Sequence, residues 1–170
     1  MAKRISLREF QQGLVEKLTS AQRGETPRAF LGVQAGNVQW LLELPETGEI
    51  VPLRHLTPVP LTKPWFRGLA NVRGTLFSVV DFSAFLGSDP TPITSETRLV
   101  MANGRFGFSC ALLVQRALGL RNLDQLDQLP DKLNEVAWVG THFCDSKGIV
   151  WKKLLIKNLF IDPEFLEIAL

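Results

Sequence analysis

Two stretches of this chain repeat one arrangement of residues, and this repeat limits the possible folds more than any other feature. The first covers residues 65–86, WFRGLANVRGTLFSVVDFSAFL, and the second covers residues 138–160, WVGTHFCDSKGIVWKKLLIKNLF. Each begins with an aromatic or apolar pair and a glycine, continues through a second glycine into an apolar strand, and ends on an apolar pair. The repeat predicts a duplicated β unit, because each copy is too small to bury its interior well without packing on the other.

The copies match at several positions, although the turn before the strand is longer in the second. The matched pairs are Gly68 and Gly140, Gly74 and Gly148, Leu76 and Val150, Phe77 and Trp151, Val80 and Leu154, Phe85 and Leu159, and Leu86 and Phe160.

Arg73 in the first copy is a candidate contact residue. It lies in the sequence Asn71-Val72-Arg73-Gly74, with Gly68 on its other side. Glycines let the backbone turn tightly where side chains would clash, so we expect Arg73 to be held at a bend rather than on a mobile tip. The alternative is that Arg73 only ties down its own loop through hydrogen bonds to carbonyl groups.

Two turn signals predict β-hairpins elsewhere in the chain. One is Gly36-Asn37 and the other is Asn103-Gly104, and runs of strand-forming residues lie on both sides of each. Asn-Gly favours a two-residue turn with positive φ at both positions, so we expect strands up to Ala102 and from Arg105 onward. The connection at residues 52–64 contains four prolines and is expected to be irregular.

Both ends of the chain carry helical patterns. Residues 5–21 have Ser6 and Glu9 at the spacing of a capping box and apolar residues at helical intervals, which predicts an amphipathic helix before a linker that ends at residue 28. This helix either packs on its own domain or docks on a partner. Near the other end, Asp162 followed by Pro163 predicts a short helix.

Composition excludes several classes of protein. The chain has 170 residues, of which 45% are hydrophobic and 21% charged, and this is typical of a globular protein rather than a coiled coil or a disordered chain. A formal net charge of +2 is too small to indicate nucleic-acid binding. The sequence has no apolar run long enough to cross a bilayer and no apolar signal-peptide core, so we expect a cytoplasmic protein without direct membrane insertion.

Signatures of catalysis are nearly absent from the sequence. It contains no Walker loop, dinucleotide fingerprint, nucleophile elbow or zinc-type cysteine spacing, and we expect no cofactor and no metal. His142 and Cys144 would share one face of a strand, but no second ligand pair or orienting carboxylate accompanies them. Cys110 and Cys144 both lie in apolar runs and are expected to be a buried free pair, although spacing alone does not exclude a disulfide.

The remaining interpretation is an all-β binding module, and a family resemblance makes it more specific. The block WFRGLANVRGTLFSVVDFSAFLG resembles the signature of CheW-like chemotaxis coupling domains, in which an apolar pair and a glycine lead into N-x-R-G, an apolar strand that ends in aspartate, and a short helix. The resemblance extends to GNVQWLLEL, ALLVQRALGL and DSKGIVWKKLLIKNLF. The chain departs from the pattern at Ser78, Gln115 and Leu155, where a proline, an acidic residue and an aspartate are common.

The resemblance implies a mainly β fold of two small intertwined five-stranded SH3-like β-barrels, to which this chain adds its N-terminal amphipathic helix and short C-terminal helix. Residues 1–28 would then be the helix and linker, and residues 29–170 the CheW-like domain. The candidate protein-binding residues are Arg73, Asn71, Gly74, Trp65 and Arg67. Trp65 is either part of the apolar interior or half exposed beside Arg73 as an interface anchor.

The resemblance also implies a function without catalysis. Family members couple the cytoplasmic tip of a chemoreceptor, bound in the groove between the barrels, to the regulatory domain of a CheA-type histidine kinase, and related domains assemble into array rings. With its N-terminal helix the chain resembles the PilI branch, which serves the chemosensory system that controls type IV pili and twitching motility. The alternatives are a CheW-like domain of another pathway, such as flagellar chemotaxis, or a small thiol-dependent enzyme that uses Cys144 and His142.

Overall fold

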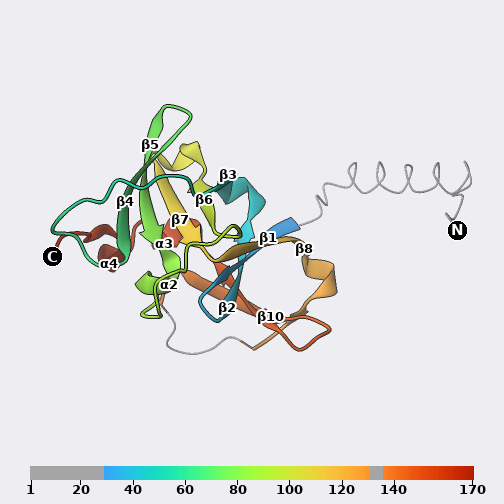
Figure 1. Cartoon of the computed structure of the whole chain (residues 1–170). Helices are drawn as coiled ribbons and strands as arrows, with labels where there is room; N and C mark the ends of the chain where they lie inside the picture. Colours follow the sequence, from blue (N-terminus) through green and yellow to red (C-terminus); the bar gives the residue numbers. More distant parts are fainter. Residues whose placement is uncertain (1–28, 131–135) are drawn as a thin grey trace, which may run out of the picture.

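The chain folds into two β-sheets connected by short helices. This computed structural model describes residues 29–130 and 136–170 (Figure 1). Sheet A has six strands in the order β8-β1-β2-β11-β10-β9, and sheet B has five in the order β3-β6-β7-β5-β4.

The strands of sheet A are β1 (Ala29–Ala35), β2 (Val38–Glu43), β8 (Arg116–Asn122), β9 (Asp127–Gln128), β10 (Val139–Cys144) and β11 (Val150–Leu154). Those of sheet B are β3 (Thr47–Pro52), β4 (Phe66–Val72), β5 (Thr75–Asp81), β6 (Arg98–Ala102) and β7 (Cys110–Val114). The helical segments are η1 (Leu44–Glu46), α2 (Phe82–Phe85), η2 (Gly104–Phe106), η3 (Leu123–Gln125), α3 (Ile156–Leu159) and α4 (Pro163–Leu166).

Sheet A is built from both ends of the described chain, and sheet B from its middle. The chain leaves sheet A after β2, completes sheet B, and returns at β8. The pairing of β2 with β11 is parallel and places Leu42 opposite Leu154, so it joins the first and last parts of sheet A. The two sheets are therefore intertwined. The expectation of five strands in each is wrong for sheet A, because the two-residue strand β9 adds a sixth, and the closed SH3-like barrel geometry stays a prediction.

The duplicated β unit is confirmed. β4, β5 and α2 form a hairpin followed by a four-residue helix, and β10, β11 and α3 repeat this order. In both copies the second strand of the hairpin also pairs in parallel with a strand from elsewhere in the chain, β5 with β7 and β11 with β2. Each copy thus contributes its hairpin to a different sheet.

The helix after each hairpin begins differently in the two copies. Asp81 caps α2, since its side chain accepts a hydrogen bond from the Ala84 amide at 3.3 Å. Leu155 occupies the corresponding position before α3, where it makes no side-chain cap. Glu46 of η1 supplies an acceptor instead, with its Oε2 3.3 Å from the amide nitrogen of Ile156. A side chain from the connection between the two sheets therefore satisfies the start of the second helix.

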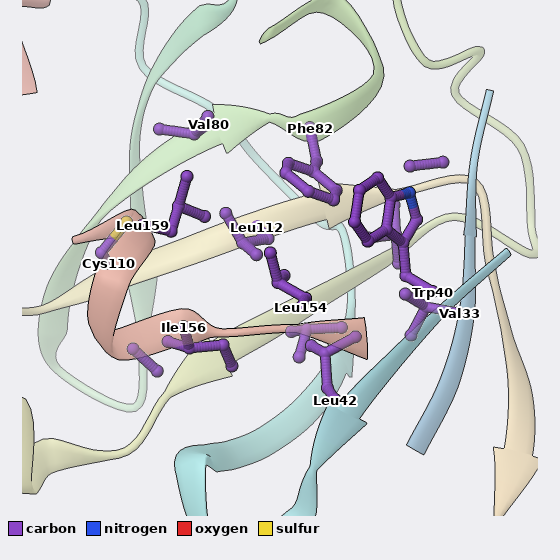
Figure 2. Packing of buried hydrophobic residues seen from close by; sticks show 14 of the residues in the cluster. Val33, Trp40, Leu42, Val80, Phe82, Cys110, Leu112, Leu154, Ile156 and Leu159 are labelled. Atoms are coloured by element: carbon purple, nitrogen blue, oxygen red, sulfur yellow. The ribbon is translucent and has the colours of Figure 1, made fainter. Parts of the chain in front are cut away.

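Apolar residues form one core between the sheets and a smaller cluster on the other face of each. Along β7, Leu112 faces the central core and Leu113 the outer cluster of sheet B, which is the period of two expected for a strand. Figure 2 shows Leu154 of sheet A beside Leu112 of sheet B, and the Trp40 ring of sheet A beside Phe82, which begins α2 after sheet B strand β5. All five residues of β7 are buried, because the strand is covered on both faces, and this explains why its sequence is continuously apolar.

The connection between β6 and β7 differs from the expectation. Asn103-Gly104 does not form a two-residue turn, because Asn103 has φ −63° and ψ 135° and η2 intervenes before β7 begins. The Asn103 side chain instead accepts a hydrogen bond from the Arg105 amide and donates one to the Pro45 carbonyl. The Gly36-Asn37 turn and the Asp162 cap of α4 are confirmed, whereas the expected N-terminal helix lies outside the described residues.

Candidate protein-binding site

Arg73 and Gly74 form the turn between β4 and β5. Val72 pairs with Thr75, so the turn has two residues, with φ 52° at Arg73 and 86° at Gly74. Positive φ at both positions matches the twist of the flanking strands, although it is uncommon for a residue with a side chain. Asn71 fixes the turn, because its Oδ1 accepts a hydrogen bond from the Gly74 amide at 2.9 Å. The expected bend at Arg73 is confirmed.

The Arg73 side chain is 77% exposed and forms an ion pair with Glu49 of β3, with 2.6 Å between Nη2 and Oε1. This contact differs from the hydrogen bonds to loop carbonyls that the sequence leaves open as the alternative. An exposed pair of this kind contributes at most about 1 kcal/mol to stability. The sequence did not single out Glu49, because nothing in its local pattern relates β3 to the β4–β5 turn.

A cavity of about 390 Å³ lies beside this turn. Its apolar wall includes Val51, Val72 and Leu99, and its polar lining consists of Glu49, Arg54, His55, Asn71 and Arg73. Two arginines and one glutamate give the lining a net positive charge. The arrangement can therefore hold an acidic group while apolar atoms pack behind it.

Trp65 is buried and lies at the opposite end of β4 from the Arg73 turn. Its side chain is 8% exposed, stacks on Phe165 with 6.2 Å between ring centroids, and meets the edge of Phe85. The half-exposed position beside Arg73 is therefore wrong. The physical reason is that α4, which is far away in the sequence, packs its Phe165 ring over the indole.

Arg67 is directed at Asp81, the aspartate that ends the apolar strand of the motif. Its Nη1 lies 3.3 Å from Oδ2 of Asp81, which is fully buried. Asp81 also accepts hydrogen bonds from the amide of Thr91 at 2.8 Å and from its hydroxyl at 2.6 Å. Arg67 thus takes part in a structural network. The structure brings together Arg73, Asn71 and Gly74 and places Arg67 away from them.

The two cysteines are both free. Cys110 is buried, and this burial raises the pKa of its thiol to about 12, so very little thiolate forms at neutral pH. Cys144 is half-buried rather than fully buried as expected, and His142 on the same strand is buried. Over residues 29–130 and 136–170, no three His, Cys, Asp or Glu side chains gather as a metal ion would require.

Comparison with known proteins identifies the family. A family model described as the CheW-like domain matches residues 29–141, which is more than half of the chain. The chain belongs to the CheW-like domain family. Protein PilI of Pseudomonas aeruginosa is 28% identical to it over 92 residues, a stretch that covers 54% of this chain and 51% of PilI. The CheW-like chain therefore matches about half the length of this curated relative.

A solved structure shares the fold of this CheW-like chain. The crystal structure of the scaffolding protein TtCheW from Thermoanaerobacter tengcongensis matches it with a TM-score of 0.64 over 76% of this chain and 84% of that chain. The sequence identity is 16%, so this likeness shows the fold alone. In the part of the chain that the structure describes, no helix has the length and apolar character needed to span a membrane.

Proposed function

We propose that this CheW-like protein is a non-catalytic adaptor of a bacterial chemosensory system. It binds the regulatory domain of a CheA-type histidine kinase and the cytoplasmic tip of a chemoreceptor, and it joins rings with itself or other CheW-like domains. Its function depends on how tightly and in what arrangement it holds the kinase and the receptor. A signal passes only if its contacts differ between the active and inactive states of the kinase.

The observation that carries this proposal is the exposed Arg73 guanidinium on a turn that Asn71 already fixes. A partner that binds there does not have to order the backbone, so binding loses less conformational entropy than it would on a flexible loop. The cavity beside the turn has a positive lining, which suits a carboxylate of the partner.

The receptor tip is proposed to bind at an apolar cavity of about 210 Å³ between sheet B and the segment after α3. Phe66 and Val80 of sheet B line one side, and Phe160 and Phe165 line the other. Phe108 at the rim is 48% exposed, which leaves an apolar surface for the side chains of a receptor helix.

The similarity to PilI supports a place in the chemosensory system that controls type IV pili and twitching motility. A CheW-like role in another pathway, such as flagellar chemotaxis, is the second candidate. Pull-down of the purified full chain with the kinase regulatory domain of each pathway separates them, and we expect retention by the pilus kinase and by its receptor tip. Retention by neither kinase nor receptor would contradict the adaptor function.

A thiol-dependent enzyme is the competing class, and native alkylation tests it. Cys110 should not react with iodoacetamide in the folded protein at neutral pH, because burial raises its pKa. Cys144 is half-buried and should react no faster than a cysteine in an unfolded peptide. Mass spectrometry after a timed reaction measures both, and rapid alkylation of Cys144 alone would favour the enzyme.

A further inference from the structure

The β10–β11 turn repeats the residue pattern of the β4–β5 turn in a longer connection, because Cys144 pairs with Val150 whereas Val72 pairs with Thr75. The first copy has Asn71-Val72-Arg73-Gly74 and the second has Asp145-Ser146-Lys147-Gly148, so both consist of an Asx residue, a variable residue, a cation and a glycine. Gly148 has φ 78°, close to the 86° of Gly74. Both Asx side chains fix their turns, although with different donors. Asp145 Oδ1 accepts hydrogen bonds from the amides of Lys147 at 2.9 Å and Ile149 at 3.0 Å, whereas Asn71 Oδ1 accepts one from the Gly74 amide. The two turns lie at different ends of the molecule (Figure 1).

A second cavity lies beside this turn. Its volume is about 430 Å³, and its lining includes Lys147, Arg121 and Trp151 together with Leu118, Leu126 and Ile149. Arg121 stacks over the Trp151 ring, with 4.9 Å from its Cζ to the ring centroid, and donates from Nη2 to the Leu118 carbonyl. The guanidinium is therefore held in place at the cavity wall rather than swinging freely in solvent.

The lining of this cavity has a net positive charge, because it contains the cations Lys147 and Arg121 and one carboxylate, Asp145. Both oxygens of Asp145 are engaged, Oδ1 by the turn amides and Oδ2 by the indole N–H of Trp151 at 3.1 Å. These hydrogen bonds, that of Trp151 above all, lower the pKa of Asp145 and keep it ionised as a structural part of the turn. Lys147 and Arg121 form no ion pair with any described residue, although the charge of Arg121 also helps to lower the pKa of Asp145. In the first copy, Arg73 is paired directly with Glu49.

We propose that Lys147 and Arg121 form a second protein-binding site, which takes a carboxylate side chain and the apolar side chain next to it from an acidic segment of a partner protein. The two cations supply the charge complementarity, and Leu118, Leu126 and Ile149 supply the apolar contact. This site goes beyond the proposed adaptor function, because it lies on the other copy of the duplicated unit from Arg73.

The test uses two short peptides and the full ¹⁵N-labelled chain. The acidic probe is acetyl-Glu-Leu-Glu-Leu-amide, and the neutral control is acetyl-Gln-Leu-Gln-Leu-amide. We expect the acidic probe to shift the assigned amide signals of Lys147 and Ile149 and the indole N–H signal of Trp151 in a saturable way, and the neutral peptide to shift them far less. Absence of these shifts, or equal shifts with the neutral peptide, would overturn the proposal.

Charge reversal provides the matched comparison. Lys147→Glu should weaken binding of the acidic probe by about threefold to tenfold, while Lys157→Glu, the same change at an exposed position on α3, should leave it unchanged. Equal weakening by both variants would mean nonspecific attraction and would overturn the site. The spectra themselves report whether each variant is folded. Neither kinase nor receptor takes part, so this result and that of the adaptor tests are independent.

Discussion

Asp81 illustrates, at the scale of a single residue, how one buried side chain connects several segments. Its carboxylate accepts hydrogen bonds from Thr91 and Ala84 and pairs with Arg67, so it joins β5, the start of α2, the following loop and β4. A buried carboxylate needs such partners, because an unpaired charge in the interior is strongly unfavourable.

We expect Asp81→Ala to destabilise the fold by about 3 kcal/mol or more. The change removes the acceptor and leaves the buried hydroxyl and amide of Thr91 without a hydrogen-bond partner. The shift of the urea unfolding midpoint measures the effect. Asp81→Asn keeps one carbonyl oxygen and the side-chain volume, so it should cost clearly less. A midpoint for Asp81→Ala equal to that of the wild type would refute this role.

At the scale of the element, the two short helices show how a lost cap is replaced. Leu155 cannot cap α3, and Glu46 accepts the hydrogen bond from the Ile156 amide in its place. Burial, helped by the nearby negative charge of Glu43, raises the pKa of Glu46 above its ordinary value of 4.5, while the Ile156 amide, Arg105 and Lys153 oppose the shift. The carboxylate therefore caps the helix at an electrostatic cost.

This cost predicts a pH-dependent difference between two variants. Because the pKa of Glu46 is raised by folding, its contribution to stability is fully present below 4.5 and declines as the pH rises through the folded-state pKa. Glu46→Gln keeps an acceptor but does not titrate, so its stability relative to the wild type should improve between pH 4 and pH 7. Glu46→Ala lacks the acceptor and should lose about 1 kcal/mol at pH 4; its loss relative to the wild type should be smaller at pH 7, because alanine does not titrate either. Urea titrations at the two pH values measure the free energy of unfolding of both variants. A Glu46→Gln variant that becomes less stable relative to the wild type as the pH rises would contradict the raised pKa of Glu46.

At the scale of the whole molecule, local sequence patterns predicted the repeat and failed for contacts between distant segments. The duplicated hairpin, the Gly36-Asn37 turn and the bend at Arg73 all follow from short-range rules of strand and turn chemistry. The burial of Trp65 depends on a ring from α4, which no local pattern reveals. The prediction of a two-residue turn at Asn103-Gly104 was wrong, because the Asn103 side chain donates a hydrogen bond to the Pro45 carbonyl and its backbone is extended.

The same limit applies to the candidate site. The family motif marked Arg73, Asn71 and Gly74, and the structure places them in one turn. Glu49, which pairs with Arg73, and Glu46, which bonds a residue 110 positions away, carry no local signal. The pattern shared by residues 71–74 and 145–148 is present in the sequence, but the hydrogen bonds that the Asn71 and Asp145 side chains accept depend on the folded backbone.

The most direct test of the adaptor function is calorimetric titration of the full chain with the regulatory domain of the CheA-type kinase. The account predicts saturable binding in the micromolar range or tighter, weakened at least about tenfold by Arg73→Glu and unchanged by Lys157→Glu, with all three proteins folded, since exposed charge changes cost little stability. If the wild type does not bind, or if Arg73→Glu binds both the kinase domain and the receptor tip with unchanged affinity, the central claim is contradicted.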